Sequence, residues 1–311
     1  MSFPAFQQVE VQTSARLHMG FYDLQSNGRF GSVGLALDAP DTQLVLAFND
    51  ALGNDQEADA ILVRICEALH VNVPLQVTVH RAIPRHVGLG SGTQLAMAIV
   101  AGLNALLNLG LTMHEMVQAA ERGRRSGIGV AAFVQGGFLV DAGRGADDVA
   151  PSVMERLDFP GQWRVVLVTD SAHIGVHGVA EKQVFQTLNP AIGNLREMIF
   201  SRMLPAFRRQ DLSAFGICMA ELQAYNGAYF SPVQGGQYAS KEVEQVLREL
   251  QSLGAACVGQ SSWGPTGFAV VENDVIAADL CKQAQQLFKN KSNIGFSICR
   301  GRNHGAVIQA R

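Results

Sequence analysis

The chain has 311 residues, of which 48% are hydrophobic and 16% charged, a balance that excludes a disordered tail and a highly charged coiled coil. Its net charge of −3 gives no general attraction to nucleic acid or to an anionic membrane, so neither is expected as a partner. The length is sufficient for two ordinary domains, each with its own core. The 24 basic residues comprise 19 Arg and 5 Lys, and the first Lys is Lys182. Before that position the permanent cations are all Arg, whose fork-shaped guanidinium binds phosphate and carboxylate at two points.

The cysteines and the apolar segments indicate a cytoplasmic protein. The five cysteines are odd in number and scattered, which argues against a disulfide framework or a thiolate zinc site. The N-terminus lacks the basic start, apolar segment and cleavage site of a signal peptide. The most apolar stretch, 95–111, is short for a membrane span and is interrupted by Asn104 and Asn108, so a buried helix is expected there.

Alternating apolar and polar residues predict strands, and apolar residues at helical spacing predict helices. In chain order we expect a strand at 7–14, two strands within 31–48 around GSVGLAL and TQLVLAF, a helix at 56–70, a strand at 75–83, a buried helix ending at Leu109, a helix opened by Thr112, a strand at 163–170, helices near 191–204, 209–225 and 239–253, a strand at 255–260, the strand FAVVE, a helix at 274–289 and the strand SNIGFSIC.

This order of elements predicts an α+β layer fold, because helices alternate irregularly with non-consecutive strands. Thr112 is expected to cap its helix, with Glu115 completing a capping box. The stretch 143–162 is weakly patterned and contains Gly, Pro and acidic residues. It predicts a boundary between a domain at 1–160 and a second domain at 161–311.

A glycine-rich loop links the strand at 75–83 to the buried helix. Gly88, Gly90 and Gly92 fall within five residues, just before the expected helix. Backbone N–H groups without Cβ obstruction can converge on a phosphate there, and the helix dipole attracts the anion. The loop matches neither a Walker loop nor a Rossmann fingerprint. The alternative interpretation is a tight strand-to-helix turn with ordinary caps.

The loop resembles the second motif of the GHMP kinase superfamily, since residues 84–92 read P-R-H-V-G-L-G-S-G. In that superfamily this loop wraps the phosphates of ATP. Counterparts of the two other signatures follow in the expected order, S-A-R-L-H-M-G at 14–20 and G-Q-S-S-W-G-P-T-G at 259–267. The resemblance implies a two-domain GHMP-kinase-like fold, with mixed sheets packed against helices.

The sequence departs from the kinase pattern at Gly129. Many superfamily kinases have an Asp base in a stretch like S-G-I-D and a Lys near the N-terminal motif, whereas residues 126–129 read S-G-I-G and no Lys precedes Lys182. Glycine cannot accept a hydroxyl proton, and Arg is too basic to do so. Some superfamily kinases lack this Asp, so an ATP-dependent small-molecule kinase remains one alternative. A non-catalytic ligand-binding protein is another.

One branch of the superfamily is similar in finer detail, through S-A-R-L-H-M-G-F-Y-D-L, G-R-F-G-S-V-G-L-A-L and G-Q-S-S-W-G-P-T-G-F. These segments look like the β-ribofuranosylaminobenzene 5′-phosphate synthase family of methanopterin biosynthesis. The resemblance implies condensation of phosphoribosyl pyrophosphate with 4-aminobenzoate or 4-hydroxybenzoate, with release of carbon dioxide and pyrophosphate. It also implies a homodimer. The residues do not choose between the two acids.

That chemistry gives the expected catalytic residues, Asp23 and Arg29. Asp23 lies in the N-terminal signature, and its carboxylate would stabilise the positive charge that develops on the sugar as pyrophosphate departs. Arg29 lies in a hairpin-like turn and would direct a guanidinium at the benzoate or a phosphate. The alternatives are a turn-capping Asp and a solvated turn Arg.

The expected substrate-binding residues come from all three signatures. Arg16 and His18 share one strand face, Arg16 to hold an anion and His18 as a proton shuttle or a structural residue. Mg²⁺ on the pyrophosphate is expected, with Ser91 as a contact. The C-terminal segment is expected to form a lip of the site whose Trp263 stacks on the benzoate ring; the alternative is a core tryptophan, which the neighbouring Ser, Gly and Pro disfavour. The remaining assignments are Gly88, Leu89, Gly90, Gly92 and Thr93 at the pyrophosphate and Ser261, Ser262, Gly264, Pro265 and Thr266 in the lip.

Other polar residues have weaker interpretations. Arg122 and the two Arg at 124–125 are explained as cations at a helix end, where they complement the dipole. His173 and His177 have i, i+4 spacing near Asp170, which suggests zinc, but no Glu lies between them in the HExxH manner. No role is assigned to Asn303 and His304.

Overall fold

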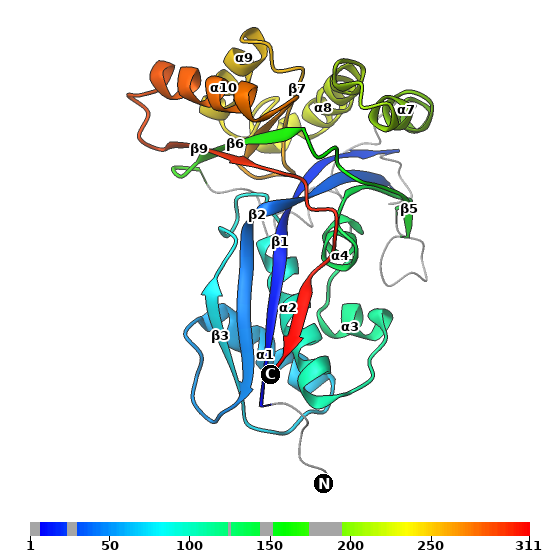
Figure 1. The fold of residues 1–311 in the computed structure, drawn as a ribbon, viewed down its shortest axis with the longest axis vertical. Helices are drawn as coiled ribbons and strands as arrows, with labels where there is room; N and C mark the ends of the chain where they lie inside the picture. Colours follow the sequence, from blue (N-terminus) through cyan, green and yellow to red (C-terminus); the bar gives the residue numbers. More distant parts are fainter. Residues whose placement is uncertain (1–6, 24–29, 124–125, 144–151, 174–194) are drawn as a thin grey trace.

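The computed structural model describes residues 7–23, 30–123, 126–143, 152–173 and 195–311. Figure 1 shows two layered bodies stacked along the long axis, each built from a sheet and helices, and in the upper body helices pack on both faces of the sheet. The predicted α+β layer fold is confirmed.

The first sheet has the strand order β10-β1-β2-β4-β5, and β3 also pairs with β2. The bounds of the elements in this half of the chain are β1 (Gln8–Tyr22), β2 (Gly31–Phe48), α1 (Gln56–Ala68), β3 (Leu75–Arg81), α2 (Ser91–Leu107), α3 (Met113–Ala119), α4 (Ile128–Val134), β4 (Phe138–Asp141) and β5 (Val153–Leu157). The predicted helix at 56–70, the buried helix and the capping box of Thr112 and Glu115 are confirmed.

The two longest strands differ from their predicted extents. β1 continues to Tyr22 instead of ending near residue 14, because nearly all of its residues from 14 onward are buried and the alternation that marks a half-exposed strand is lost. β2 is one continuous strand where two were predicted, and its two halves pair with β1 on either side of a register shift between Ala36 and Asp41. Both strands run the length of the lower body and into the upper one (Figure 1).

The second sheet has the order β7-β8-β6-β9 and lies in the upper body, with α8, α9 and α10 around it (Figure 1). The predicted strands and helices of this half are confirmed where the structure describes them, with 191–194 outside the described residues, and α8 extends nine residues beyond its expected end at 225. The bounds are β6 (Arg164–Asp170), α6 (Leu195–Met198), η1 (Ile199–Met203), α7 (Leu204–Arg208), α8 (Leu212–Gln234), α9 (Lys241–Ser252), β7 (Cys257–Gln260), β8 (Gly267–Val271), α10 (Asp274–Leu287) and β9 (Ile294–Cys299).

One strand after β9 was not predicted. β10 (Val307–Ala310) returns to the first sheet and pairs antiparallel with the start of β1. Just before it, Asn303 binds the main chain of Phe159, with Oδ1 accepting from its N–H at 2.7 Å and Nδ2 donating to its carbonyl at 3.0 Å. Asn303 therefore fixes the path of the chain between the two sheets. The domain division at residue 160 stays a prediction.

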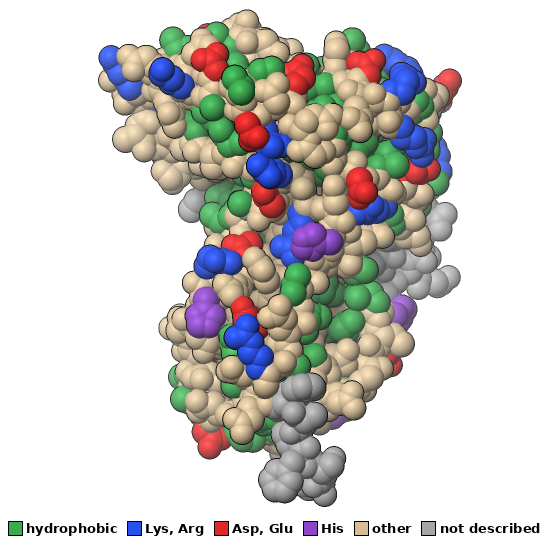
Figure 2. Space-filling view, in the orientation of Figure 1, with side chains coloured by type: hydrophobic (Ala, Val, Ile, Leu, Met, Phe, Trp, Pro, Cys, Tyr) green, Lys and Arg blue, Asp and Glu red, His purple; other side chains and the backbone are tan. Residues whose placement is uncertain are grey.

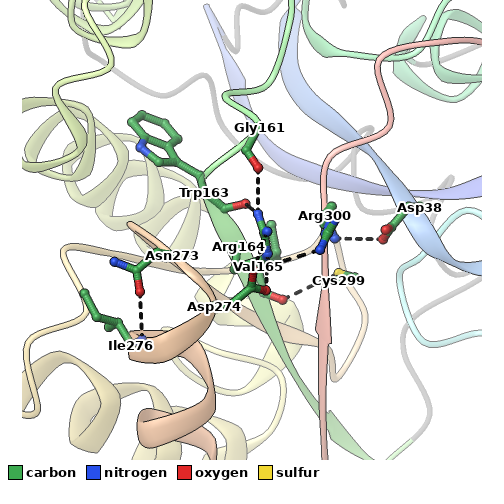
Figure 3. A network of polar contacts seen from close by, with 10 residues as sticks. All are labelled: Asp38, Gly161, Trp163, Arg164, Val165, Asn273, Asp274, Ile276, Cys299 and Arg300. Atoms are coloured by element: carbon green, nitrogen blue, oxygen red, sulfur yellow. Dashed lines mark hydrogen bonds and ion pairs between the residues drawn. The ribbon is translucent and has the colours of Figure 1, made fainter.

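A polar network connects the two bodies at the start of β6 (Figure 3). Arg164 is 6% exposed, and its guanidinium forms a two-point ion pair with Asp274 while Nη1 donates to two main-chain carbonyls. Arg300 lies beside the same carboxylate, and its N–H donates to Asp38 of β2 at 2.7 Å. This network joins the second sheet and α10 to the long strand that carries the first sheet.

In Figure 2, acidic and basic side chains are interspersed over the face shown, without one extended patch of a single sign. None of the helices in the described ranges combines the length and apolarity needed to cross a bilayer. The five cysteine thiols are free.

Candidate active site

The three signature segments, far apart in sequence, meet at one place in the structure. The N–H of Arg16 donates to the carbonyl of Leu89 at 3.0 Å, which joins β1 to the glycine-rich loop. The hydroxyl of Ser261 donates to the carbonyl of Gly88 at 2.7 Å and accepts from the N–H of His18 at 3.0 Å. One buried serine therefore links the C-terminal segment to both other signatures. We call this meeting point the three-motif junction.

Two glycines allow the loops of the junction to approach each other. Gly88 has φ +87°, and a Cβ there would lie 2.3 Å from the carbonyl oxygen of Ser261. A Cβ at Gly264 would lie 2.1 Å from the carbonyl oxygen of Val87. Both distances are far below any Cβ contact, so the two loops pack backbone against backbone only because these residues are glycines.

The junction also orients the N–H groups of the glycine-rich loop. The carbonyls of Gly88 and Leu89 both point toward β1 and its neighbours, where Arg16 and Ser261 bind them. In a trans peptide the next N–H points opposite to the carbonyl, so the N–H groups of Leu89 and Gly90 point away from β1. Two consecutive N–H groups directed to one side form a concave anion-binding surface.

The start of α2 continues this surface. Its N-cap is Gly90, with φ +83° and no side-chain cap in the described structure. The first N–H groups of a helix lack intrahelical partners, and a helix start left without a side-chain cap favours an anion. The predicted residues Gly88 to Thr93 therefore form one continuous loop and helix start, with Ser91 as the first residue of the helix.

Arg16 contacts the loop itself. Its Nη1 donates to the carbonyl of Gly88 at 2.7 Å, and a Cβ at Gly90 would lie 3.0 Å from its Cγ and 3.1 Å from its Nε. The side chain thus packs against the loop and holds one of its carbonyls. Direct contact between Arg16 and an anion stays a prediction.

The C-terminal segment is not an open lip. Trp263 is 4% exposed and packs against Phe230, with ring centroids 4.1 Å apart, in a cluster with Phe21 and Phe30. The expectation of an exposed Trp263 was wrong, because the segment folds back onto α8 and β1. Thr266 is fully buried as well. Stacking of Trp263 on a substrate ring stays a prediction.

A cavity lies beside the junction, between the end of β1, the C-terminal half of α8 and the C-terminal segment. The cavity is partly open to solvent. His18, which is 3% exposed, contributes its ring from the strand side, 4.2 Å from the ring of Phe21. The lining residues are His18, Gly20, Phe21, Gln223, Asn226, Gly227, Phe230, Gln234, Gln237, Gln260, Ser262 and Trp263.

Of the two predicted catalytic residues, Asp23 is in the described part of the chain and Arg29 is not. Asp23 follows the last residue of β1 with φ +54°, and its Oδ2 lies 3.6 Å from Nη1 of Arg196, a cation that sequence reasoning missed. Five residues of extended chain separate it from His18, at most about 17 Å. Among the described residues, Asp23 makes no contact with the three-motif junction. Arg29 lies outside the described residues.

Asp141, at the end of β4, is a further polar residue that the sequence analysis missed. Its carboxylate is fully buried and accepts from the N–H groups of Ser32, Gly127 and Gly143 at 2.9–3.0 Å and from the hydroxyls of Ser32 and Ser126. Burial raises the pKa of Asp141, and these donors oppose the rise. The carboxylate fixes the turn at the start of the S-G-I-G stretch against β2.

Gly129 lies against the first turn of α2. A Cβ there would lie 2.9 Å from Cγ2 of Thr93, so the methyl group of Thr93 occupies the space that a side chain would need. The side chain of Gln94 also donates to the carbonyl of Gly129 at 2.8 Å. The first turn of α2 therefore occupies the space that a side chain would need where many kinases of the superfamily have their base. This helix begins at the glycine-rich loop, which we also call the phosphate-type loop.

The helix-end interpretation of Arg122 was wrong. α3 ends at Ala119 and has no basic residue in its last turn. Arg122 instead reaches the start of α2, where its Nη2 lies 3.8 Å from the Cβ position of Gly92. The structure therefore adds a cation beside the glycine-rich loop. The two Arg at 124–125 lie outside the described residues.

The zinc interpretation gains no support from the part of the chain that is described. Within those ranges no group of three or more His, Cys, Asp or Glu side chains is placed to hold a metal ion. Asp170 accepts instead from Ser240 Oγ and Asn293 Nδ2, each at 2.7 Å. His177 lies outside the described residues.

Comparison with known proteins identifies similar sequences along most of the chain. The family models described as the GHMP kinases N terminal domain and the GHMP kinases C terminal domain match residues 56–137 and 203–290. The chain is 31% identical over 294 residues to beta-ribofuranosylphenol 5'-phosphate synthase of Methanothermobacter thermautotrophicus, covering 84% of this chain and 88% of that protein. It is 29% identical over 326 residues to the protein of the same name from Archaeoglobus fulgidus, covering 97% and 99%.

Solved structures of the same fold are more distant in sequence. Homoserine kinase from Cytophaga hutchinsonii superposes with a TM-score of 0.69 at 17% identity, covering 99% of each chain. Mevalonate diphosphate decarboxylase from Staphylococcus aureus superposes with a TM-score of 0.68 at 14% identity, covering 97% of this chain and 98% of that one. These likenesses show the fold alone.

Proposed function

The chain belongs to the GHMP kinase family, in its beta-ribofuranosylphenol 5'-phosphate synthase branch, and from this premise we propose its reaction. The enzyme is a pentosyltransferase that joins the ribose carbon of phosphoribosyl pyrophosphate to the ring of 4-hydroxybenzoate or 4-aminobenzoate. Carbon dioxide and pyrophosphate leave, and the product is a C-riboside 5′-phosphate for tetrahydromethanopterin biosynthesis.

The observation that best supports this proposal is a retained phosphate-type loop beside a closed base position. The N–H groups of Leu89 and Gly90 and the uncapped start of α2 suit a pyrophosphate. Gly129, where many kinases of the superfamily have a base, has no side chain, and Thr93 fills the space. The site thus keeps the means to bind a diphosphate without the means to deprotonate an alcohol.

The proposed reaction needs no base at the bond-forming carbon. The new bond forms between ring carbon 1 and the anomeric carbon as the bond to pyrophosphate breaks. The bond from ring carbon 1 to the carboxylate then breaks, its electron pair returns to the ring, and carbon dioxide leaves in place of a proton. A kinase must instead remove a proton from its alcohol. The absence of a base at Gly129 is therefore compatible with the transferase chemistry.

The protein's task is then to stabilise charge. Asp23 is proposed to stabilise the cationic sugar, and Arg29 to bind an anionic group of one substrate. Arg16 and Ser261 hold the loop whose N–H groups receive the pyrophosphate. Arg122 adds a positive charge at the start of α2.

We also propose Mg²⁺ as the cofactor of this site. Ser91 is partly exposed at a helix start without a side-chain cap, so its hydroxyl would be available as one oxygen ligand of an Mg²⁺ ion that is otherwise held by the substrate phosphates and water. The ion would neutralise charge on the departing pyrophosphate. A homodimer and a cytoplasmic location belong to the same proposal, and light scattering of the purified protein would test the dimer.

The decisive experiment follows the carboxyl carbon. The purified protein is incubated with phosphoribosyl pyrophosphate, Mg²⁺ and carboxyl-labelled 4-hydroxybenzoate or 4-aminobenzoate, and released carbon dioxide is trapped. Release that depends on both substrates is expected. No release from either acid, together with ATP consumption on adding an alcohol, would favour the kinase alternative. Binding of the substrates without any turnover would favour a non-catalytic ligand-binding protein.

A further inference from the structure

The cavity beside the three-motif junction is lined by uncharged groups. Apart from His18, its described lining consists of three aromatic rings, five side-chain amides and small residues, with no Asp, Glu, Lys or Arg among them. A lining without Lys or Arg does not neutralise the negative charge of a phosphate. The faces and edges of Phe21, Phe230 and Trp263 instead suit a flat ring. The lining therefore points to an aromatic ligand with few, precisely placed polar atoms.

Four of the five amide oxygens already accept hydrogen bonds within the protein. Gln223, Asn226 and Gln260 accept from main-chain N–H groups at 2.6–2.8 Å, and Gln234 accepts from Nε2 of Gln260 at 3.3 Å. Gln237 is the exception. Its Nε2 donates to the carbonyl of Gln223 at 2.9 Å, but its Oε1 accepts from none of the described residues.

The position of Gln237 depends on a glycine inside α8. A Cβ at Gly227 would lie 2.1 Å from Nε2 of Gln237 and 2.5 Å from its Oε1. Glycine inside a helix lowers the stability of the helix, so its presence here needs a reason. The reason is that the amide of Gln237 occupies the place of the missing side chain. The helix and the amide together set one fixed hydrogen-bond acceptor in the wall of the cavity.

We propose that this cavity binds the aromatic ring of the benzoate, with its 4-amino or 4-hydroxyl group donating a hydrogen bond to Oε1 of Gln237. The inference rests on the proposed function and names the ring subsite of that same active site. Both candidate acids carry an N–H or O–H donor at ring position 4, which matches a single acceptor. Ring carbon 1, where the new bond forms, lies at the opposite end of the ring. It would then face His18 and Ser262, beside the phosphate-type loop, where the N–H of Ser262 donates to the carbonyl of His18 at 2.9 Å.

A binding measurement on the full chain tests the subsite without turnover. Ribose 5-phosphate and pyrophosphate are present, and 4-aminobenzoate, 4-hydroxybenzoate and unsubstituted benzoate are titrated by calorimetry. The wild-type protein is expected to bind both 4-substituted acids about tenfold more tightly than benzoate, since one hydrogen bond to the partly buried Oε1 of Gln237 distinguishes them. In Gln237→Met this difference is expected to vanish, while the affinity for ribose 5-phosphate stays unchanged. The matched control is Gln245→Met, on the exposed face of α9, which should keep the full discrimination.

Two results would overturn the inference. One is equal affinity of the wild-type protein for all three acids, or no binding of any. The other is unchanged discrimination in Gln237→Met. Gly227→Ala gives an independent variant, because the added methyl group must displace the same amide, and it should lose discrimination in the same way. If discrimination is present but carbon dioxide is never released, the transferase proposal fails and the ring subsite stands. If carbon dioxide is released without discrimination, only the subsite fails.

Discussion

Ser261 is the residue whose removal tests the three-motif junction most directly. Its hydroxyl accepts from the N–H of His18 and donates to the carbonyl of Gly88, and the side chain is fully buried. In Ser261→Ala the N–H of His18 loses this acceptor inside the protein, which destabilises a folded chain by about 1–3 kcal/mol. The lost bond to Gly88 adds about 0.5–1.5 kcal/mol. The free energy of unfolding should therefore fall by roughly 1.5–4.5 kcal/mol.

The same change should affect catalysis. Gly88 keeps the bond from Arg16 but loses one of its two donors, so the loop is held less firmly against β1. Small displacements of positioning groups lower rates by up to about a hundredfold, and a fall in kcat/KM for phosphoribosyl pyrophosphate of at least about tenfold is expected. Urea unfolding and carbon dioxide release measure the two effects. The control is Ser231→Ala, which removes only an exposed bond within α8. Full activity together with a loss of stability below about 0.5 kcal/mol would refute the reasoning.

Three further changes test other parts of the site. Asp23→Asn should lower carbon dioxide release more than about tenfold with an unchanged circular dichroism spectrum, and wild-type turnover would remove Asp23 from the reaction. Gly129→Asp should lower the thermal midpoint without creating ATP-dependent phosphoryl transfer, because Thr93 blocks the new side chain; an unchanged midpoint would contradict this. Burial raises the pKa of Asp170, but the hydrogen bonds that Asn293 and Ser240 donate to its carboxylate have the larger effect, so its pKa lies below the ordinary value. The stabilisation is thus present above about pH 4 and lost below it, so Asp170→Asn should flatten the acid limb of a stability–pH curve, which urea unfolding at several pH values would show.

The sequence predicted local features of the site well and non-local ones poorly. Glycines at 88 and 90 are visible in the sequence because a chain that needs positive φ before a helix has few other choices. The capping box at Thr112 is equally local. By contrast, Asp141 appears only as the last residue of a short apolar run. Its role depends on Ser32 and Gly127, which are distant in sequence.

Burial was hardest to predict where the neighbouring residues suggested a loop. The Ser, Gly and Pro residues around Trp263 are typical of exposed segments, yet the segment is covered by α8 and β1. The pairing of β10 with β1 was missed for a related reason, since a four-residue strand gains its order from a partner almost 300 residues away. Periodicity within a segment contains no information about such partners.

The direction in which the phosphate-type loop presents its N–H groups is determined outside the loop. A glycine-rich sequence permits many backbone paths, and the same residues could direct carbonyls toward an anion and repel it. Here two carbonyls are held on the β1 side, one by both Arg16 and Ser261 and one by the main chain of β1. The planar guanidinium of Arg16 both packs against Gly90 and donates to Gly88, a combination that a compact ammonium on a flexible stem does not reproduce. Arg in place of Lys near this loop is therefore explained by the loop's own architecture. A transferase that deprotonates no alcohol needs no base at Gly129, but to bind a diphosphate it needs the residues that orient the loop.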